Sequence, residues 1–247
     1  GGVGPSIASD RGRWSLMSGH SDSDQSPYDE AETLAQVQGV TARLMRGPSR
    51  VLDLGCGSGR IAGHLCRAGH DVTGVDRASR HRSGFEVSTD AKATFVVGDF
   101  SSATGCRMLP AGPFDAILLL GNTLALIREP SIVRDLFLAL AERLDPEGIL
   151  VYDDFSFTSW AELAAGNWGE GISEDGSMQM IWIPGEPEFV LRSGAEVDPE
   201  DDEPRPEERV LRIWSMAELN DAAVLAGLTV GGHDPAASMV VHVHANP

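Results

Sequence analysis

The fold is decided by residues 51–60, which read Val51-Leu52-Asp53-Leu54-Gly55-Cys56-Gly57-Ser58-Gly59-Arg60. A strand that ends at Leu54 would lead into a turn of three glycines, where the missing Cβ atoms let the backbone bend sharply and approach a ligand closely. A second apolar run, residues 72–75, ends at Asp76, 23 residues after Asp53. A carboxylate at that place suits the hydroxyl groups of a ribose. The pattern therefore predicts a strand, a ligand-binding turn and a short helix packed on a sheet.

The glycine turn departs from the dinucleotide-binding fingerprint, because Gly-x-Gly-x-x-Gly counted from Gly55 requires glycine where Arg60 stands. Residues 53–59 instead resemble the signature loop of class I S-adenosylmethionine-dependent methyltransferases. Three later segments resemble the third, fourth and fifth strands of that family: Val-Val-Gly-Asp-Phe at 96–100, Phe-Asp-Ala-Ile-Leu-Leu-Leu-Gly-Asn at 114–122, and Gly-Ile-Leu-Val-Tyr-Asp at 148–153. The resemblance covers residues 50–157.

This resemblance implies S-adenosylmethionine as cofactor and places its contacts at the ends of strands. The glycine loop lies against the methionine part, and Asp76 accepts the ribose hydroxyls. Asp99 and Phe100 hold the adenine, while Leu120 and Gly121 flank the sulfonium. The implied cofactor contacts are Asp53, Leu54, Gly55, Cys56, Gly57, Asp76, Arg77, Gly98, Asp99, Phe100, Leu120 and Gly121.

The apolar pattern predicts an α/β fold. Apolar residues recur at helical spacing over residues 30–45 and 131–144, which predicts a helix before the first strand and another before the fifth. Strands and helices alternate through residue 155, as in a parallel sheet with helices on both faces. Together with the resemblance, this predicts a Rossmann-like, mostly parallel sheet of seven strands whose last strand is antiparallel.

The chain divides into a tail, one main domain and an insertion. Residues 1–27 are rich in Gly, Ser and Asp and are expected to form a flexible tail. Residues 28–157 and 215–247 are expected to form the cofactor-binding domain. Between them, residues 158–214 contain short strand patterns at 178–183, 189–191 and 209–214 without helices, which predicts an antiparallel β-rich insertion that covers the substrate.

Two features refine the end of the chain. Residues 196–208 are acidic and contain three prolines, which is typical of a mobile, solvated loop. Ser215 and Glu218 form a capping-box pattern that begins a helix, and Gly227 would end it. The stretch Arg-Ile-Trp-Ser at 212–215 and the turn Gly-Asn-Thr at 121–123 are similar to small-molecule methyltransferases of the glycine N-methyltransferase-like and sugar-amine groups.

Composition limits the partners. The 247 residues carry a formal net charge of −18 with 37 acidic and 19 basic side chains. So acidic a surface repels phosphate backbones, which argues against a nucleic-acid substrate. The acidity favours capture of a cationic small molecule, and solubility alone explains it equally well. No apolar stretch is long enough to cross a bilayer. Three cysteines are too few for a disulfide framework, so we expect the reducing cytoplasm. A homodimer is left open.

Candidate catalytic residues follow the fourth and fifth strands. Asp153 and Asp154 are adjacent carboxylates at a strand end. We hypothesise that one of them, with Asn122 and Tyr28, orients the acceptor and takes a proton or hydrogen bond; the alternative is that one only orients and the other is solvated. The histidines offer no convincing base, and His233 is a remote candidate. A metal held by Asp153, Asp154 and Asn122 is a minor option, and no metal ligand is assigned.

The sequence therefore predicts an S-adenosylmethionine-dependent methyltransferase acting on a small molecule. The leading acceptor is the amine of an aminosugar or related natural product, such as an antibiotic intermediate. The turn at 121–124 lacks the Pro-Pro-aromatic element that methyltransferases of nucleic-acid bases use, which argues against a base as acceptor. In the glycine N-methyltransferase-like group that the chain resembles, an arginine holds the substrate carboxylate, and Phe155 stands at that position here, which argues against an amino-acid acceptor. O-methylation of a sugar or phenol is the alternative. A cofactor-binding module without catalysis is a further one.

Overall fold

A computed structural model describes residues 30–44, 47–154, 171–173 and 175–245. In chain order, the main elements are α1 (Glu30–Thr41), β1 (Arg50–Leu54), α2 (Arg60–Arg67), β2 (Asp71–Asp76), α3 (Arg82–Ser88), β3 (Thr94–Val97), α4 (Ala103–Arg107), β4 (Phe114–Leu119), α5 (Pro130–Ala141), β5 (Leu144–Asp153), β6 (Met178–Trp182), β7 (Glu188–Ser193), β8 (Val210–Arg212), α7 (Met216–Leu225), β9 (Leu228–Asp234) and β10 (Met239–His244). Short 3₁₀ turns lie at η1 (Ser79–His81), η2 (Thr123–Leu126) and η4 (Gly194–Glu196).

The central sheet has seven strands in the order β3-β2-β1-β4-β5-β10-β9. Strands β1 to β5 pair in parallel, and β10 is antiparallel to both of its neighbours. The predicted Rossmann-like sheet with an antiparallel last strand is confirmed. Strand order reverses between β1 and β4, and in open α/β sheets ligands bind at such a switch point, beyond the carboxyl ends of the strands.

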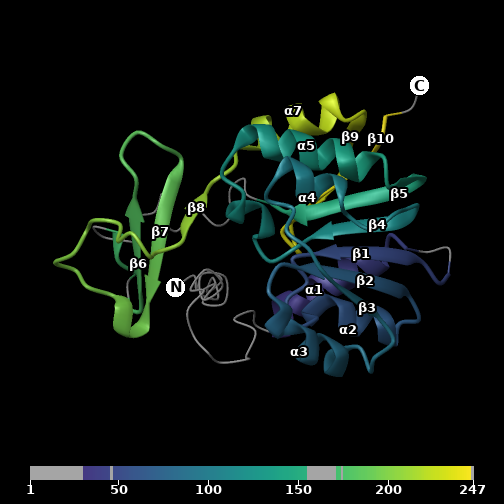
Figure 1. Cartoon of the computed structure of the whole chain (residues 1–247), viewed down its shortest axis with the longest axis horizontal. Coiled ribbons are helices and arrows are strands. Elements are labelled where there is room, and N and C mark those ends of the chain that lie inside the picture. The colour runs from purple at the N-terminus through teal and green to yellow at the C-terminus, as the bar shows by residue number, and fades with distance from the viewer. Residues whose placement is uncertain (1–29, 45–46, 155–170, 174, 246–247) are drawn as a thin grey trace, which may run out of the picture.

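Helices pack against both faces of this sheet (Figure 1), and each face has its own apolar core. One core joins the sheet to α1, α2 and α3 through buried side chains such as Val40, Leu65 and Phe85. The other joins it to α4, α5 and α7, with Phe137 and Leu219 fully buried. Alternate residues of each strand face alternate cores, because side chains in a strand point to opposite faces. Leu52 and Leu54 belong to one core, and Val51 to the other.

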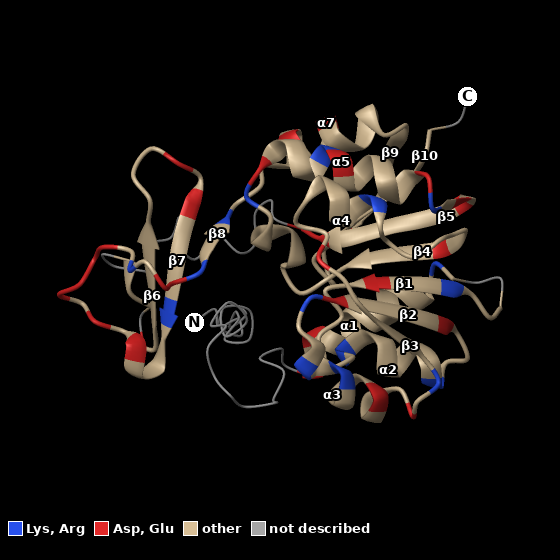
Figure 2. Cartoon of the chain, viewed as in Figure 1, with Lys and Arg blue, Asp and Glu red and all other residues tan. Residues whose placement is uncertain are grey.

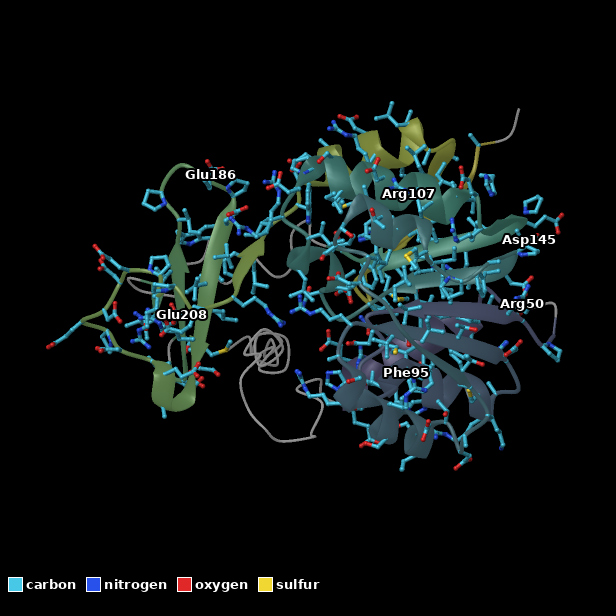
Figure 3. All side chains as sticks on the ribbon, in the orientation of Figure 1. Arg50, Phe95, Arg107, Asp145, Glu186 and Glu208 are labelled. Carbon is cyan, nitrogen blue, oxygen red and sulfur yellow. The ribbon has the colours of Figure 1, made fainter. Side chains whose placement is uncertain are left out.

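The second sheet, β6-β7-β8, is antiparallel and lies beyond the carboxyl ends of β4 and β5 (Figure 1). Arg50 and Asp145, near the amino ends of β1 and β5, lie on the far side of the molecule from Glu208 in this region (Figure 3). The indole N–H of Trp214 donates to the Leu124 carbonyl at 2.9 Å, and Arg128 pairs with Glu188 at 2.7 Å. These contacts attach the second sheet to the η2 turn of the main sheet.

Most residues of the acidic loop 196–208 are exposed to solvent, and none is buried. It forms much of the red trace beside β6 and β7 in Figure 2, yet it is held to the second sheet by Arg192, whose side chain is only 1% exposed. Arg192 donates to the Glu208 carboxylate and to the Asp201 and Glu203 carbonyls. Gln179, opposite Arg192 in the strand register, donates to two more carbonyls of the loop. A buried cation and amide therefore fix the loop, which composition alone could not indicate.

Element boundaries shift where tertiary contacts decide them. Helix α1 ends at Thr41 instead of continuing to residue 45, and α5 ends at Ala141 because β5 already begins at Leu144. Strand β8 keeps three of the six expected residues. The capping box of α7 is present as predicted, with Ser215 and Glu218 exchanging hydrogen bonds.

Candidate active site

The glycine turn joins β1 to α2 at the centre of the sheet. Gly55, Gly57 and Gly59 all have positive φ, at 72°, 50° and 86°, a conformation that side chains with a Cβ adopt only with strain. The Gly55 N–H donates to the Val75 carbonyl at 2.8 Å, which ties the turn to β2. A Cβ at Gly55 would lie 2.5 Å from the Thr123 hydroxyl oxygen, whereas one at Gly57 would meet nothing within 4 Å. The turn thus packs tightly against η2 and is open at Gly57.

Asp76 ends β2 beside the open part of this turn. One carboxylate oxygen accepts the Gly57 N–H at 3.1 Å, and the other accepts the Ala78 N–H at 2.8 Å. The side chain is half-buried and each oxygen retains a free lone pair beyond these bonds. A carboxylate fixed in this way can accept hydrogen bonds from the two hydroxyls of a ribose, so these residues fit the cofactor that the sequence implies.

Asp53 is buried two residues before the glycine turn. Burial raises its pKa to about 7, while Arg60 opposes the rise and Asp76 adds to it. Arg60 also donates to the Gln36 side-chain oxygen at 2.9 Å and to the Thr33 hydroxyl at 3.2 Å. Burial also raises the pKa of the neighbouring Cys56 thiol, with the charges of Asp53 and Asp76 adding to the rise.

The predicted adenine side of the site lies at the end of β3. Asp99 is exposed and accepts hydrogen bonds from the Ser101 N–H at 2.9 Å and hydroxyl at 2.6 Å. The Ser101 hydroxyl is the main cause that lowers the Asp99 pKa. Phe100 is buried and Arg77 is exposed. The Gly98 N–H donates to the Asp76 carbonyl at 3.1 Å, which links this end to the ribose side.

The turn after β4 faces the glycine turn across the switch point. Leu120 is buried, Gly121 has a φ of 86°, and Asn122 is held in the left-handed region with a φ of 55°. The Thr123 hydroxyl donates to the Leu120 carbonyl at 3.0 Å and lies against Gly55. The two turns therefore form one connected edge.

Asp153, the last residue of β5, connects the Asn122 turn to α1. Its carboxylate accepts the Asn122 N–H at 2.6 Å and the Gln36 side-chain N–H at 3.0 Å. Both Gln36 and Asp153 are buried. Through Gln36, the network continues to Arg60 on α2. Asp153 thus acts on the Asn122 turn as a positioning group.

Asp154 forms a pair that the sequence did not reveal. One of its carboxylate oxygens lies 2.6 Å from Nε2 of His233, and the Asp154 side chain is 4% exposed while that of His233 is 48% exposed. The Asp154 N–H also donates to the Ser238 carbonyl at 2.7 Å. In sequence the two residues are separated by 79 positions; the only signal was that both follow or end strands.

One predicted site residue cannot be placed, because Tyr28 lies outside the described residues, as do Phe155, Phe157, Trp160 and Trp168. Among the residues that are described, no group of three or more His, Cys, Asp or Glu side chains could hold a metal ion. Within the same part of the chain, no helix combines the length and apolar character needed to span a membrane.

Comparisons with known proteins match this chain to methyltransferases. Residues 51–148 match a family model described as "Methyltransferase domain". YqeM of Bacillus subtilis (strain 168), itself named only as a candidate methyltransferase, is 33% identical over 135 residues, which cover 54% of this chain and 52% of YqeM. The chain spans about half the length of the curated relatives it matches.

Solved structures extend the likeness to most of the chain. A S-adenosylmethionine-dependent methyltransferase from Clostridium acetobutylicum superposes with a TM-score of 0.63 at 13% identity, covering 88% of this chain and 93% of that one. This is a class I methyltransferase fold. The sugar N-methyltransferase KedS8 from Streptoalloteichus sp. shares this fold with a TM-score of 0.58 at 20% identity, covering 88% of each chain. The methyltransferase fold and the matched domain support S-adenosylmethionine as the cofactor.

Proposed function

We propose that this protein transfers a methyl group from S-adenosylmethionine to a small molecule, with the amine of an aminosugar or related natural product as the leading acceptor. One observation carries the proposal: the glycine turn, the Asp76 carboxylate and the Asn122 turn meet at the switch point of the sheet. Methyl transfer needs a site of this kind. In our proposal the Asp76 carboxylate binds the nucleoside of the donor, and the Asn122 turn lies against the methyl carbon that is transferred.

In this proposal the residues at the strand ends hold and align the reactants. Asp76 binds the ribose hydroxyls, Asp99 and Phe100 hold the adenine, and Gly57 leaves room for the methionine part. The bound cofactor supplies a methyl group on a positively charged sulfur, which is already a good leaving group. The protein's contribution is then to align the reactants and to exclude water. The fixed Asn122 turn provides a rigid surface for this alignment.

The second sheet supports a small acceptor. We propose that residues 158–214 cover the substrate, because β8 and Trp214 attach this sheet to the η2 turn, directly after Asn122. The net charge of −18 favours a cationic acceptor. KedS8, a sugar N-methyltransferase of the same fold, is a precedent for an aminosugar. Three buried free cysteines suit a reducing cytoplasm.

O-methylation of a sugar or phenol is a second candidate function. The close pair of Asp154 and His233 favours it, because a hydroxyl acceptor must lose a proton and benefits from a base.

Methyl transfer can be tested directly. The protein is incubated with methyl-labelled S-adenosylmethionine and a panel of aminosugars, sugar nucleotides and phenols, and products are identified by mass spectrometry. We expect labelled product from an aminosugar, with the label on nitrogen. Label on oxygen would favour the second candidate. Tight cofactor binding in calorimetry, together with no labelled product across the panel, would instead indicate a binding module without catalysis.

A further inference from the structure

We propose that His233, backed by Asp154, is the proton acceptor of this site, so that the acceptor nucleophile is one that carries a proton, a hydroxyl or an ammonium. The inference rests on the proposed methyltransferase function and adds the residue that takes the proton of the acceptor. It assigns a role to a histidine that the sequence offered only as a remote candidate base.

The pair has the geometry of a carboxylate that orients an imidazole. The Asp154 carboxylate is buried and lies 2.6 Å from Nε2 of the half-exposed His233 ring. A carboxylate accepts, so Nε2 must carry the hydrogen that forms this bond, and the neutral ring then presents Nδ1 as a free acceptor. Among the described residues, Asp154 is the partner that the His233 ring contacts.

The fold places the pair at the reactive edge of the sheet. Asp154 directly follows Asp153, whose carboxylate holds the Asn122 N–H. His233 lies near the end of β9, in register with Val240 of β10 and, across it, with Tyr152 of β5. Strands β5 and β9 run in the same direction, because each is antiparallel to β10 between them. Their carboxyl ends therefore share the edge that carries the glycine turn.

The other acids near His233 are paired with groups other than its ring. Asp153 is engaged by Gln36 and Asn122, and Asp234, next to His233, pairs with Arg43 of α1 at 3.0 Å. The neighbouring acids are thus satisfied by other groups. An ordinary surface ion pair would have both partners exposed, whereas here the acid is buried and the ring alone reaches the surface.

The proposed step balances as follows. The Nδ1 lone pair of His233 takes the proton of the acceptor, the O–H or N–H bond breaks, and its electron pair stays on the acceptor atom. That pair forms the new bond to the methyl carbon, and the carbon–sulfur bond breaks with its electrons going to sulfur, which becomes neutral. The resulting imidazolium is stabilised by the Asp154 carboxylate until solvent removes the proton.

Nuclear magnetic resonance of ¹⁵N-histidine-labelled protein tests the orientation without any acceptor. We expect the neutral His233 ring to carry its hydrogen on Nε2, and Asp154→Ala to weaken this preference between the two ring nitrogens. A ring protonated on Nδ1, or an unchanged preference in the variant, would overturn the proposal.

Kinetics test the proton transfer itself, with the panel acceptor that the wild-type protein methylates fastest. General bases contribute about 10²–10⁴-fold, so His233→Ala should reduce kcat by about 100-fold or more with little change in cofactor affinity, and added imidazole should restore part of the rate. His244→Ala, at the opposite end of β10, is the matched control and should retain full activity. Full activity of His233→Ala would overturn the inference while leaving the methyltransferase function intact. A wild-type protein that methylates nothing would overturn both.

Discussion

Gly55 is the residue at which the two turns of the site touch. Its φ of 72° demands a left-handed backbone, and a Cβ there would lie 2.5 Å from the Thr123 hydroxyl oxygen. Two penalties therefore coincide at one position, a conformational one and a steric one. Backbone conformation and packing against Thr123 therefore both require a glycine at this position.

Gly55→Ala should lower the free energy of unfolding by about 1–3 kcal/mol more than the same substitution at a left-handed glycine in open space, because overpacking adds to backbone strain. Gly185→Ala is the matched control, since Gly185 has a φ of 82° and nothing within 4 Å of an added Cβ. Thermal and urea unfolding of the two variants measure the difference. Equal losses of stability would show that Thr123 moves aside freely.

Asp76 is the residue on which nucleoside binding depends in our proposal. Hydrogen bonds to a charged group contribute about 1.5–3 kcal/mol, so Asp76→Ala should weaken S-adenosylmethionine binding by tenfold or more, measured by isothermal titration calorimetry. Asp71→Ala, at the exposed start of the same strand, should bind the cofactor like the wild type. An unchanged dissociation constant in Asp76→Ala would contradict the assignment of the ribose site.

At the scale of elements, Arg192 decides whether the acidic loop is ordered. Its guanidinium lowers the pKa of Glu208, and a carboxyl with a lowered pKa stabilises the folded state at higher pH. This contribution is present above the ordinary pKa of 4.5 and is lost as the pH falls through the lower folded value. The loop should therefore loosen in acid.

Arg192→Met should free the loop, at a cost of about 3 kcal/mol, because a partly buried carboxylate loses its partner. Limited proteolysis at neutral pH should then cut within residues 196–208. Arg205→Met is the control, because this half-exposed arginine pairs with Asp201 across one turn of the loop and should matter less. A loop that resists protease in Arg192→Met would mean that Gln179 alone holds it.

His242 gives β10 a pH dependence of its own. Burial lowers its pKa to about 4 from an ordinary 6.5, so the unfolded chain binds this proton more readily than the folded one. Stability should fall as the pH drops from about 6.5 towards 4. His242→Gln should flatten that part of the stability curve, followed by urea unfolding at several pH values. A slope equal to that of the wild type would assign the effect to other groups.

At the scale of the whole molecule, Trp214 joins the two sheets. Its indole is 2% exposed and donates to the Leu124 carbonyl at 2.9 Å. Trp214→Phe keeps an apolar ring but removes one of the two hydrogen bonds that the Leu124 carbonyl accepts, the other coming from the Ile127 N–H. Loss of one such hydrogen bond costs about 0.5–1.5 kcal/mol. We expect a lower melting temperature and a raised KM for the acceptor. Trp182→Phe, 43% exposed on β6, should change neither by as much. An unaltered KM in Trp214→Phe would argue against the second sheet as a substrate cover.

The sequence by itself determined the sheet and its cofactor edge. The glycine turn, the strand-terminal acids and the alternation of strands and helices are local patterns, and each of them depends on residues close together in the chain. Gly55, Asp76 and Asn122 could be assigned to strand ends for this reason, and the seven-stranded sheet with its antiparallel last strand followed from the resemblance.

Only the tertiary structure decided which distant side chains pair. His233 meets Asp154, and Gln36 on the leading helix holds Asp153, because β9 and α1 are brought to the end of β5 by the fold. Arg192 likewise binds the acidic loop 196–208, a contact that composition alone could not indicate. Such pairs leave no periodic signal, since a hydrogen bond across 79 or 117 residues depends on strand order and side-chain direction rather than on local sequence.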